Sequence, residues 1–116
     1  MSFKLNKVMT THLIKFVRKI EIHFNPIDAR TTSVRELWRQ VTAARFEKAN
    51  PNMKVTIEMV QGAAHPTAKV ELVDGTKMNF EGQKYHCKEI LEAIYMKASQ
   101  LDIELELEGK SIDDIA

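Results

Sequence analysis

The chain has 116 residues, of which 44% are hydrophobic and 28% charged, as is ordinary for one globular domain. No apolar run approaches the roughly 20 residues of a membrane helix, and the single cysteine, Cys87, excludes an internal disulfide and a metal site built from several cysteines. The formal net charge of +1 hides an asymmetry, because residues 1–60 hold 11 Lys and Arg against 5 Asp and Glu, whereas residues 61–116 hold 6 against 11.

Residues 1–17 are expected to form a basic N-terminal arm. The first 20 residues carry five basic side chains and no acidic one. Such a segment suits contacts with phosphate backbones or acidic partners, and it also suits a mitochondrial targeting segment. The apolar residues have a loosely helical spacing, so the arm could be a short amphipathic helix, an extended segment or a solvated tail.

Residues 18–24 alternate apolar and polar side chains, which predicts a half-buried strand with Ile20, Ile22 and Phe24 on one face. The Asn25-Pro26 pair ends this strand, because proline cannot donate to a sheet.

Ser33 and Glu36 have the spacing of a capping box, which predicts a helix over residues 33–49. Its expected apolar stripe consists of Val34, Leu37, Trp38, Val41 and Ala44.

The second half of the chain predicts three strands and a helix. The strands are expected over 53–59, 68–73 and 76–80, and Asp74-Gly75 predicts a tight hairpin between the last two. Helical spacing over 86–101 predicts a second helix. Residues 102–116 are expected to form an acidic C-terminal tail, in which the alternation over 103–107 could be a short edge strand or a frayed end.

The order β-α-β-β-β-α predicts a four-stranded mixed sheet with two main helices, both of which could lie on one face. That is the core of the thioredoxin-like α/β fold, here over residues 18–101. A ferredoxin-like topology is the rival, and it would need residues 103–107 as its last strand.

The chemistry of a thioredoxin-like enzyme is missing from this sequence. Redox members of that fold place a cysteine in the loop after the first strand, but residues 25–30 contain neither Cys nor Ser. Pro66 stands where those enzymes carry a cis-proline. Cys87 falls on the apolar side of its helix and is expected to be buried and inert. We therefore expect no catalytic residue, no cofactor, no metal and no small-molecule substrate.

Basic residues of the first half could form a phosphate-contacting surface, with an ordinary solvated helix face as the alternative. No groove-reading motif accompanies them, so contact would position the chain without reading a base sequence. The expected RNA or partner contacts are Lys15, Arg18, Lys19, Arg30, Arg35 and Arg39.

Three segments together resemble the mitochondrial large-subunit ribosomal protein family numbered fifty-three. They are VRKIEIHFNPIDARTTSVRELWRQV, NPNMKVTIEMV and AKVELVDGTKMNFEG. The resemblance covers about residues 17–100, and its matching positions are Ile22, Phe24, Asn25, Pro26, Val70, Asp74, Gly75 and Met78. Ile27 departs from the pattern, which has an aromatic residue after the proline.

The resemblance implies a non-enzymatic component of the mitochondrial ribosome, located in the matrix. Its partners would be large-subunit rRNA and neighbouring ribosomal proteins, with no membrane contact. The alternative is an accessory subunit of respiratory complex I with protein-only contacts, because residues 48–55 are similar to the helix-to-strand junction of that related family.

Overall fold

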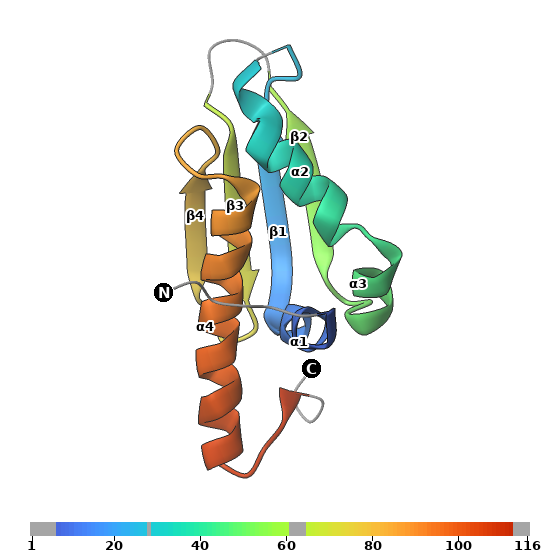
Figure 1. Cartoon of the computed structure of the whole chain (residues 1–116), viewed down its shortest axis with the longest axis vertical. Coiled ribbons are helices and arrows are strands. Elements are labelled where there is room, and N and C mark those ends of the chain that lie inside the picture. The colour runs from blue at the N-terminus through green and yellow to red at the C-terminus, as the bar shows by residue number, and fades with distance from the viewer. Residues whose placement is uncertain (1–6, 28, 61–64, 113–116) are drawn as a thin grey trace.

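The computed structural model describes residues 7–27, 29–60 and 65–112. It confirms the expected α/β class with a four-stranded mixed sheet (Figure 1). In chain order the elements are α1 (Lys7–Leu13), the 3-10 turn η1 (Ile14–Phe16), β1 (Val17–Phe24), the 3-10 turn η2 (Ala29–Thr31), α2 (Thr32–Val41), α3 (Ala44–Ala49), β2 (Lys54–Met59), β3 (Thr67–Leu72), β4 (Lys77–Glu81) and α4 (Cys87–Leu107).

The strands lie in the order β2-β1-β3-β4. β1 and β2 are parallel, whereas β3 is antiparallel to both β1 and β4. The expected hairpin is present between β3 and β4, where Gly75 adopts a φ of 91° and its amide donates to the carbonyl of Leu72 over 3.0 Å. A residue with a β-carbon rarely adopts that φ, so glycine is the residue this turn requires.

One face of the sheet carries the core. Ile20, Ile22 and Phe24 are buried on that face, because side chains alternate between the two faces of a strand. α2 and α4 both cover this face (Figure 1), and buried residues of the two helices share one cluster with the strands. The molecule is therefore two-layered over the described residues, with the charged face of the sheet left open.

The packed core extends beyond the predicted domain of residues 18–101. Part of the expected basic arm is folded, since Leu13, Ile14, Phe16 and Val17 are buried, as is Ile112 near the other end. α1 also contacts α4, where His12 Nε2 lies 3.2 Å from Asp102 Oδ1.

The predicted helix over 33–49 is wrong in its continuity, because α2 and α3 are separated at residues 42 and 43. At roughly 100° per residue, a continuous helix that buries Leu37 and Val41 would turn Phe46 about 140° or more away from them. The break allows Phe46 to be buried. The hydroxyl of Thr42 donates to the carbonyl of Trp38 over 2.7 Å and so helps to close α2.

The predicted capping box is also wrong. Ser33 lies inside α2, and its hydroxyl donates to the carbonyl of Gly82. Glu36 contacts the side chains of Arg39 and Gln40 instead of a backbone amide. The link between Ser33 and residue 82 joins segments far apart in sequence, so spacing within the helix could not reveal it.

The second helix is longer than predicted, since α4 continues to Leu107. Residues 103–107 are helical, which removes the last strand required by the ferredoxin-like alternative. The inner face continues through Leu101 and Leu105, four residues apart, and this outweighs the two-residue alternation. α4 ends before Gly109, whose φ is 74°.

Pro66 follows a trans peptide bond, because no bond between described residues is cis. It therefore differs from the cis-proline of the redox enzymes.

Candidate nucleic-acid interface

The six basic residues expected to contact RNA lie on separate parts of the molecule. Lys15 and Arg18 lie where η1 meets β1, Lys19 is on the open face of the sheet, and Arg30 is in η2. Arg35 and Arg39 lie on α2. Arg35 and Arg39 line a common hollow.

Two of these arginines hold distant segments of their own chain. The guanidinium of Arg18 donates to the carbonyl of Val73 over 2.7 Å, and that of Arg30 donates to Gln83 Oε1 over 3.0 Å. Each guanidinium carries further N–H groups that point in other directions. These side chains therefore brace the two ends of the sheet and still present positive charge at the surface.

Lys19 belongs to a surface on which the charges cancel. Its ammonium lies 2.5 Å from the carboxylate of Glu21. The hydrogen bond to Glu21 raises the pKa of Lys19, and the same bond lowers the pKa of Glu21. Both side chains are partly exposed, so water and salt screen this pair.

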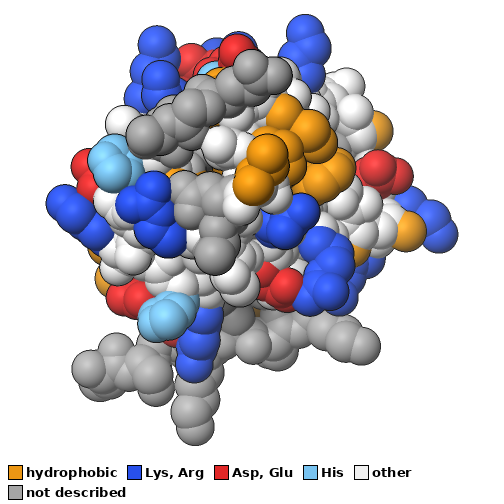
Figure 2. All heavy atoms as spheres, turned by 90° about the horizontal axis from the view of Figure 1, so that it is seen from above, with side chains coloured by type: hydrophobic (Ala, Val, Ile, Leu, Met, Phe, Trp, Pro, Cys, Tyr) orange, Lys and Arg blue, Asp and Glu red, His pale blue; other side chains and the backbone are white. Residues whose placement is uncertain are grey.

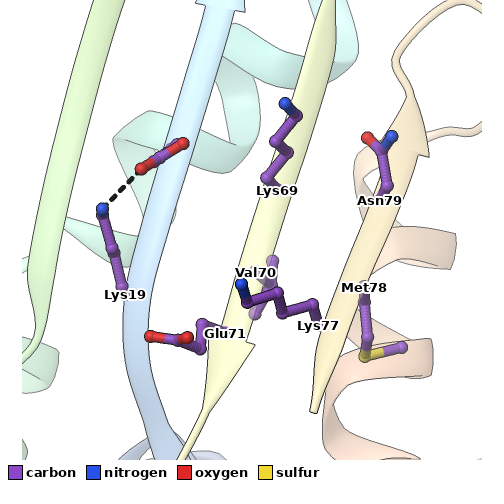
Figure 3. A pocket seen from close by; sticks show the side chains of 8 residues that line it. Lys19, Lys69, Val70, Glu71, Lys77, Met78 and Asn79 are labelled. Carbon is purple, nitrogen blue, oxygen red and sulfur yellow. Dashed lines mark ion pairs between the residues drawn. The ribbon is translucent and has the colours of Figure 1, made fainter. Parts of the chain in front are cut away.

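The open face has as many acidic as basic side chains over the described strands. Strand register places four lysines and four glutamates on it: Lys19, Lys54, Lys69 and Lys77 with Glu21, Glu58, Glu71 and Glu81. Lys19, Lys69, Glu71 and Lys77 surround a shallow hollow of about 350 Å³ there (Figure 3). A face with no net charge has no long-range attraction for phosphate, so Lys19 is a poor candidate for RNA contact.

The outer side of α2 has a different composition. Arg35, Trp38 and Arg39 line a shallow hollow of about 550 Å³ together with Thr32, Glu36 and Thr42. Residues three and four apart are neighbours on a helix, so Arg35 is next to both Trp38 and Arg39. Val34, Leu37 and Val41 are buried on the other side of α2 and fix its rotation about its axis.

The arginines on α2 are held by neighbouring side chains. The guanidinium of Arg35 lies 5.7 Å from the ring centroid of Phe24, and that of Arg39 is paired with Glu36. Trp38 is 37% exposed, and the hydrogen bond from Thr42 to its carbonyl closes the helix one turn later. An accessible indole beside two guanidinium groups can stack on a nucleobase while the arginines contact its phosphates.

Sequence reasoning assigned Trp38 to the buried stripe, but the residue is 37% exposed. The sequence did indicate this exposure, because Trp38 follows the buried Leu37 by one residue and is therefore rotated from it by roughly 100° about the helix axis. Its neighbours at positions −3 and +1 are arginines, which favour an outward position.

A second group of basic and apolar side chains lies at the end of the molecule where β1 and β2 finish. Figure 2 views this end and shows Lys and Arg side chains around a cluster of apolar ones. Ile27 follows β1 and is 91% exposed, and Met59 ends β2 and is also exposed. Arg30 lies in the connection from β1 to α2, at the same end.

Cys87 is buried at the start of α4, as expected from the sequence. It contributes to a hollow of about 990 Å³ between the N-terminal ends of α2 and α4. Burial raises the pKa of its thiol to about 11, so the thiol is protonated at neutral pH and is a poor nucleophile.

The described residues contain no group of three or more His, Cys, Asp and Glu placed to hold a metal ion. Within the same residues, no helix has the length and apolarity needed to span a membrane.

A family model described as "Domain of unknown function (DUF8302)" matches residues 12–107. The match runs from the end of α1 through α4 and therefore includes the whole sheet. No curated protein matches the chain.

Proposed function

The chain belongs to the DUF8302 family. We propose that it is a structural component of the mitochondrial ribosome. In this proposal it resides in the matrix and docks on rRNA and neighbouring proteins of the large subunit without catalysing a reaction. The resemblance to the ribosomal protein family numbered fifty-three suggests the particle. The arrangement of Arg35, Trp38 and Arg39 on α2 is the observation that carries the RNA contact.

Electrostatic attraction and base stacking both stabilise the proposed RNA contact. Arg35 and Arg39 attract the phosphate backbone, and binding releases condensed counterions. Trp38 then stacks on an unpaired base, which contributes about 1–3 kcal/mol in comparable sites. Such a contact positions the protein on RNA and has little dependence on base sequence.

The other predicted RNA contacts are expected to contribute unequally to binding. Arg30 adds positive charge at the β1 end, and Lys15 and Arg18 do so at the opposite end of that strand. Lys19 contributes least, since lysines and glutamates balance on its face of the sheet, whereas the outer side of α2 has two arginines against Glu36.

The fold is proposed to be thioredoxin-like. Support comes from the strand order β2-β1-β3-β4, from the parallel pairing of β1 with β2, and from a β3 that is antiparallel to its neighbours. In this frame the position of a redox nucleophile falls in residues 25–30, which contain no Cys or Ser. The buried, protonated thiol of Cys87 does not replace it. The scaffold therefore serves as a shaped block for docking.

Sedimentation of the epitope-tagged chain tests the assignment to a particle. We expect migration with the large ribosomal subunit from mitochondria, and loss of that migration after RNase treatment. Migration with respiratory complex I that survives RNase would refute the proposal and favour the alternative of an accessory subunit with protein-only contacts.

Charge reversal tests the surface. The double variant R35E/R39E should weaken binding to large-subunit rRNA by about tenfold or more per arginine, because a charge-assisted hydrogen bond contributes about 1.5–3 kcal/mol. The matched control K69E/K77E makes the same change of charge on the open sheet face and should bind almost normally. Equal losses in the two variants would show that the effect is one of overall charge and would contradict an RNA site on α2.

Stacking can be observed directly, because Trp38 is the single tryptophan of the chain. Single-stranded poly(U) should quench its fluorescence, whereas polyphosphate of equal charge should not. Equal quenching by both polymers, or by neither, would argue against a base on the indole.

A further inference from the structure

α4 carries a second apolar stripe on the side that faces away from the sheet. Its inner side contributes Ile94 and Leu101 to the core, where both are buried. On the outer side Met96 is 53% exposed, Ile103 is 54% exposed and Leu107 is 83% exposed. A helix that covers a sheet normally presents polar residues to water on this side, so the outer stripe is unusual.

The three exposed residues lie on one side of the helix, with the exposed Gln100 between Met96 and Ile103. Met96 and Ile103 are seven residues apart, and Leu107 follows four residues later, which places all three within roughly 40° on the helix. Met96 lies two residues beyond Ile94, and Ile103 lies two residues beyond Leu101. Two residues correspond to a rotation of roughly 160° to the opposite side of the helix. The stripe is about 16 Å long, or three turns, at 1.5 Å per residue.

Acidic side chains surround the C-terminal part of the stripe. Over residues 101–108 the acids are Asp102, Glu104, Glu106 and Glu108, and the same residues include no Lys or Arg. Four carboxylates at this end of a helix are repelled by the negative end of its dipole, and α4 has no basic residue in its last turn. His12 lies near Asp102, and Lys110 Nζ lies 3.9 Å from Glu108 Oε2, so within the described residues these two groups offset only part of the repulsion. Cations supplied by another molecule would relieve this repulsion.

The position of the stripe also favours a partner. In Figure 1 the C-terminal turns of α4 extend past the ends of the strands, where neither the sheet nor α2 covers them. α1 contacts α4 near Asp102 through His12, on a different side from Ile103 and Leu107, which stay exposed.

We propose that Met96, Ile103 and Leu107 form the docking surface for a basic amphipathic helix of another protein. Apolar residues of the partner would cover the stripe, and its lysines or arginines would face the acids around it. A second copy of this chain fits poorly, because it would bring two acidic stripes together, and an anionic membrane would be repelled for the same reason. The surface is separate from the RNA contact on α2, and the proposal holds whichever particle contains the chain.

Two synthetic peptides of 18 residues provide the first test. Both repeat Leu with the spacing i, i+3, i+7, and one carries Lys at the polar positions where the other carries Glu. Fluorescence anisotropy should show that the Lys peptide binds the full chain at least about tenfold more tightly than the Glu peptide. The double variant I103Q/L107Q should lose at least about tenfold in affinity for the Lys peptide.

The control variant is I27Q, which removes an exposed isoleucine that follows β1, and β1 ends far from the C-terminal turns of α4 (Figure 1). It should bind the Lys peptide as the unaltered chain does, and circular dichroism should show unchanged helix content in all variants. Equal binding of both peptides, or equal affinities in I27Q and I103Q/L107Q, would overturn the proposal. Dimers in analytical ultracentrifugation that are lost in I103Q/L107Q would overturn it in favour of a second copy.

Crosslinking in the cell identifies the partner. Benzoylphenylalanine at position 107 should crosslink to a protein segment with Lys or Arg on one side and apolar residues at helical spacing on the other, whereas the same group at position 27 should not. Crosslinks at 107 only to lipid, to a second copy or to nothing would refute the proposal. The RNA-binding tests on Arg35 and Arg39 are unaffected by these outcomes, so the two proposals fail separately.

Discussion

Replacing Asn50 by alanine should separate the N-terminal segment from the body of the domain. The side-chain amide of Asn50 donates to two carbonyl groups, that of Ile14 over 2.8 Å and that of Val17 over 2.7 Å. Asn50 is half-buried, and Ile14 and Val17 are buried. One side chain at the end of α3 therefore holds the point where η1 becomes β1.

The expected magnitude follows from these two hydrogen bonds. Each such bond contributes about 0.5–1.5 kcal/mol, so Asn50→Ala should lower the free energy of unfolding by about 1–3 kcal/mol. Asn50→Asp keeps the shape but places carboxylate oxygens against two carbonyl oxygens, and it should cost more than alanine. Asn52→Ala alters an exposed residue of the adjacent turn and should change stability by less than about 0.5 kcal/mol.

Urea unfolding followed by circular dichroism measures these differences. Amide hydrogen exchange should also become faster at Phe16 and Val17 in Asn50→Ala, because their segment loses its attachment. An Asn50→Ala or Asn50→Asp protein as stable as the unaltered chain would refute the reasoning. It would mean that apolar packing alone holds residues 13–17 in place.

Two further predictions concern the ends of α2 and α4. Gly82→Ala would place a β-carbon 2.7 Å from Val34 Cγ1. This clash should lower the free energy of unfolding in urea by about 1–3 kcal/mol. In a Val34→Ala background the loss should be at most half as large. Additive effects in that double-mutant cycle would contradict the contact. Burial raises the thiol pKa of Cys87 to about 11, so iodoacetamide at pH 8 should modify the native chain far more slowly than the urea-unfolded chain. Because the unfolded thiol loses its proton first, at about pH 8.5, the native state should lose stability as pH rises from there to 11, and Cys87→Ala should flatten that part of the profile. A profile identical to that of Cys87→Ala would show that the thiol is ionised equally in both states.

The strands were the most predictable elements of this protein. β1 buries one face only, so the alternation through Ile20 and Ile22 can be read directly from the sequence. The hairpin at Asp74-Gly75 was equally readable, because the amide of Thr76 bonds to Asp74 Oδ1 and Gly75 supplies the positive φ within a few residues. Local features of this kind depend on neighbours in the chain.

The helices were less predictable because their limits depend on the core. The break between α2 and α3 serves the burial of Phe46, and the extension of α4 serves the packing of Leu101 and Leu105. Ser33 had the spacing of a cap but bonds to Gly82 instead. Helical propensity alone permits either outcome, so packing decides among them.

The candidate site was likewise predictable from the sequence only in part. The sequence identified basic residues in the first half of the chain and the absence of a nucleophile in residues 25–30. It did not separate Lys19, which lies on a face where lysines and glutamates balance, from Arg35 and Arg39, since the glutamates of the open face come from several strands.

The sequence by itself determined the class of fold, the positions of the strands and the missing redox cysteine, because composition and local periodicity carry that information. The tertiary structure alone decided that Trp38 is accessible between two arginines and that α4 is apolar on two opposite sides. Exposure depends on which neighbours a folded chain places over each side chain, and those neighbours are distant in sequence.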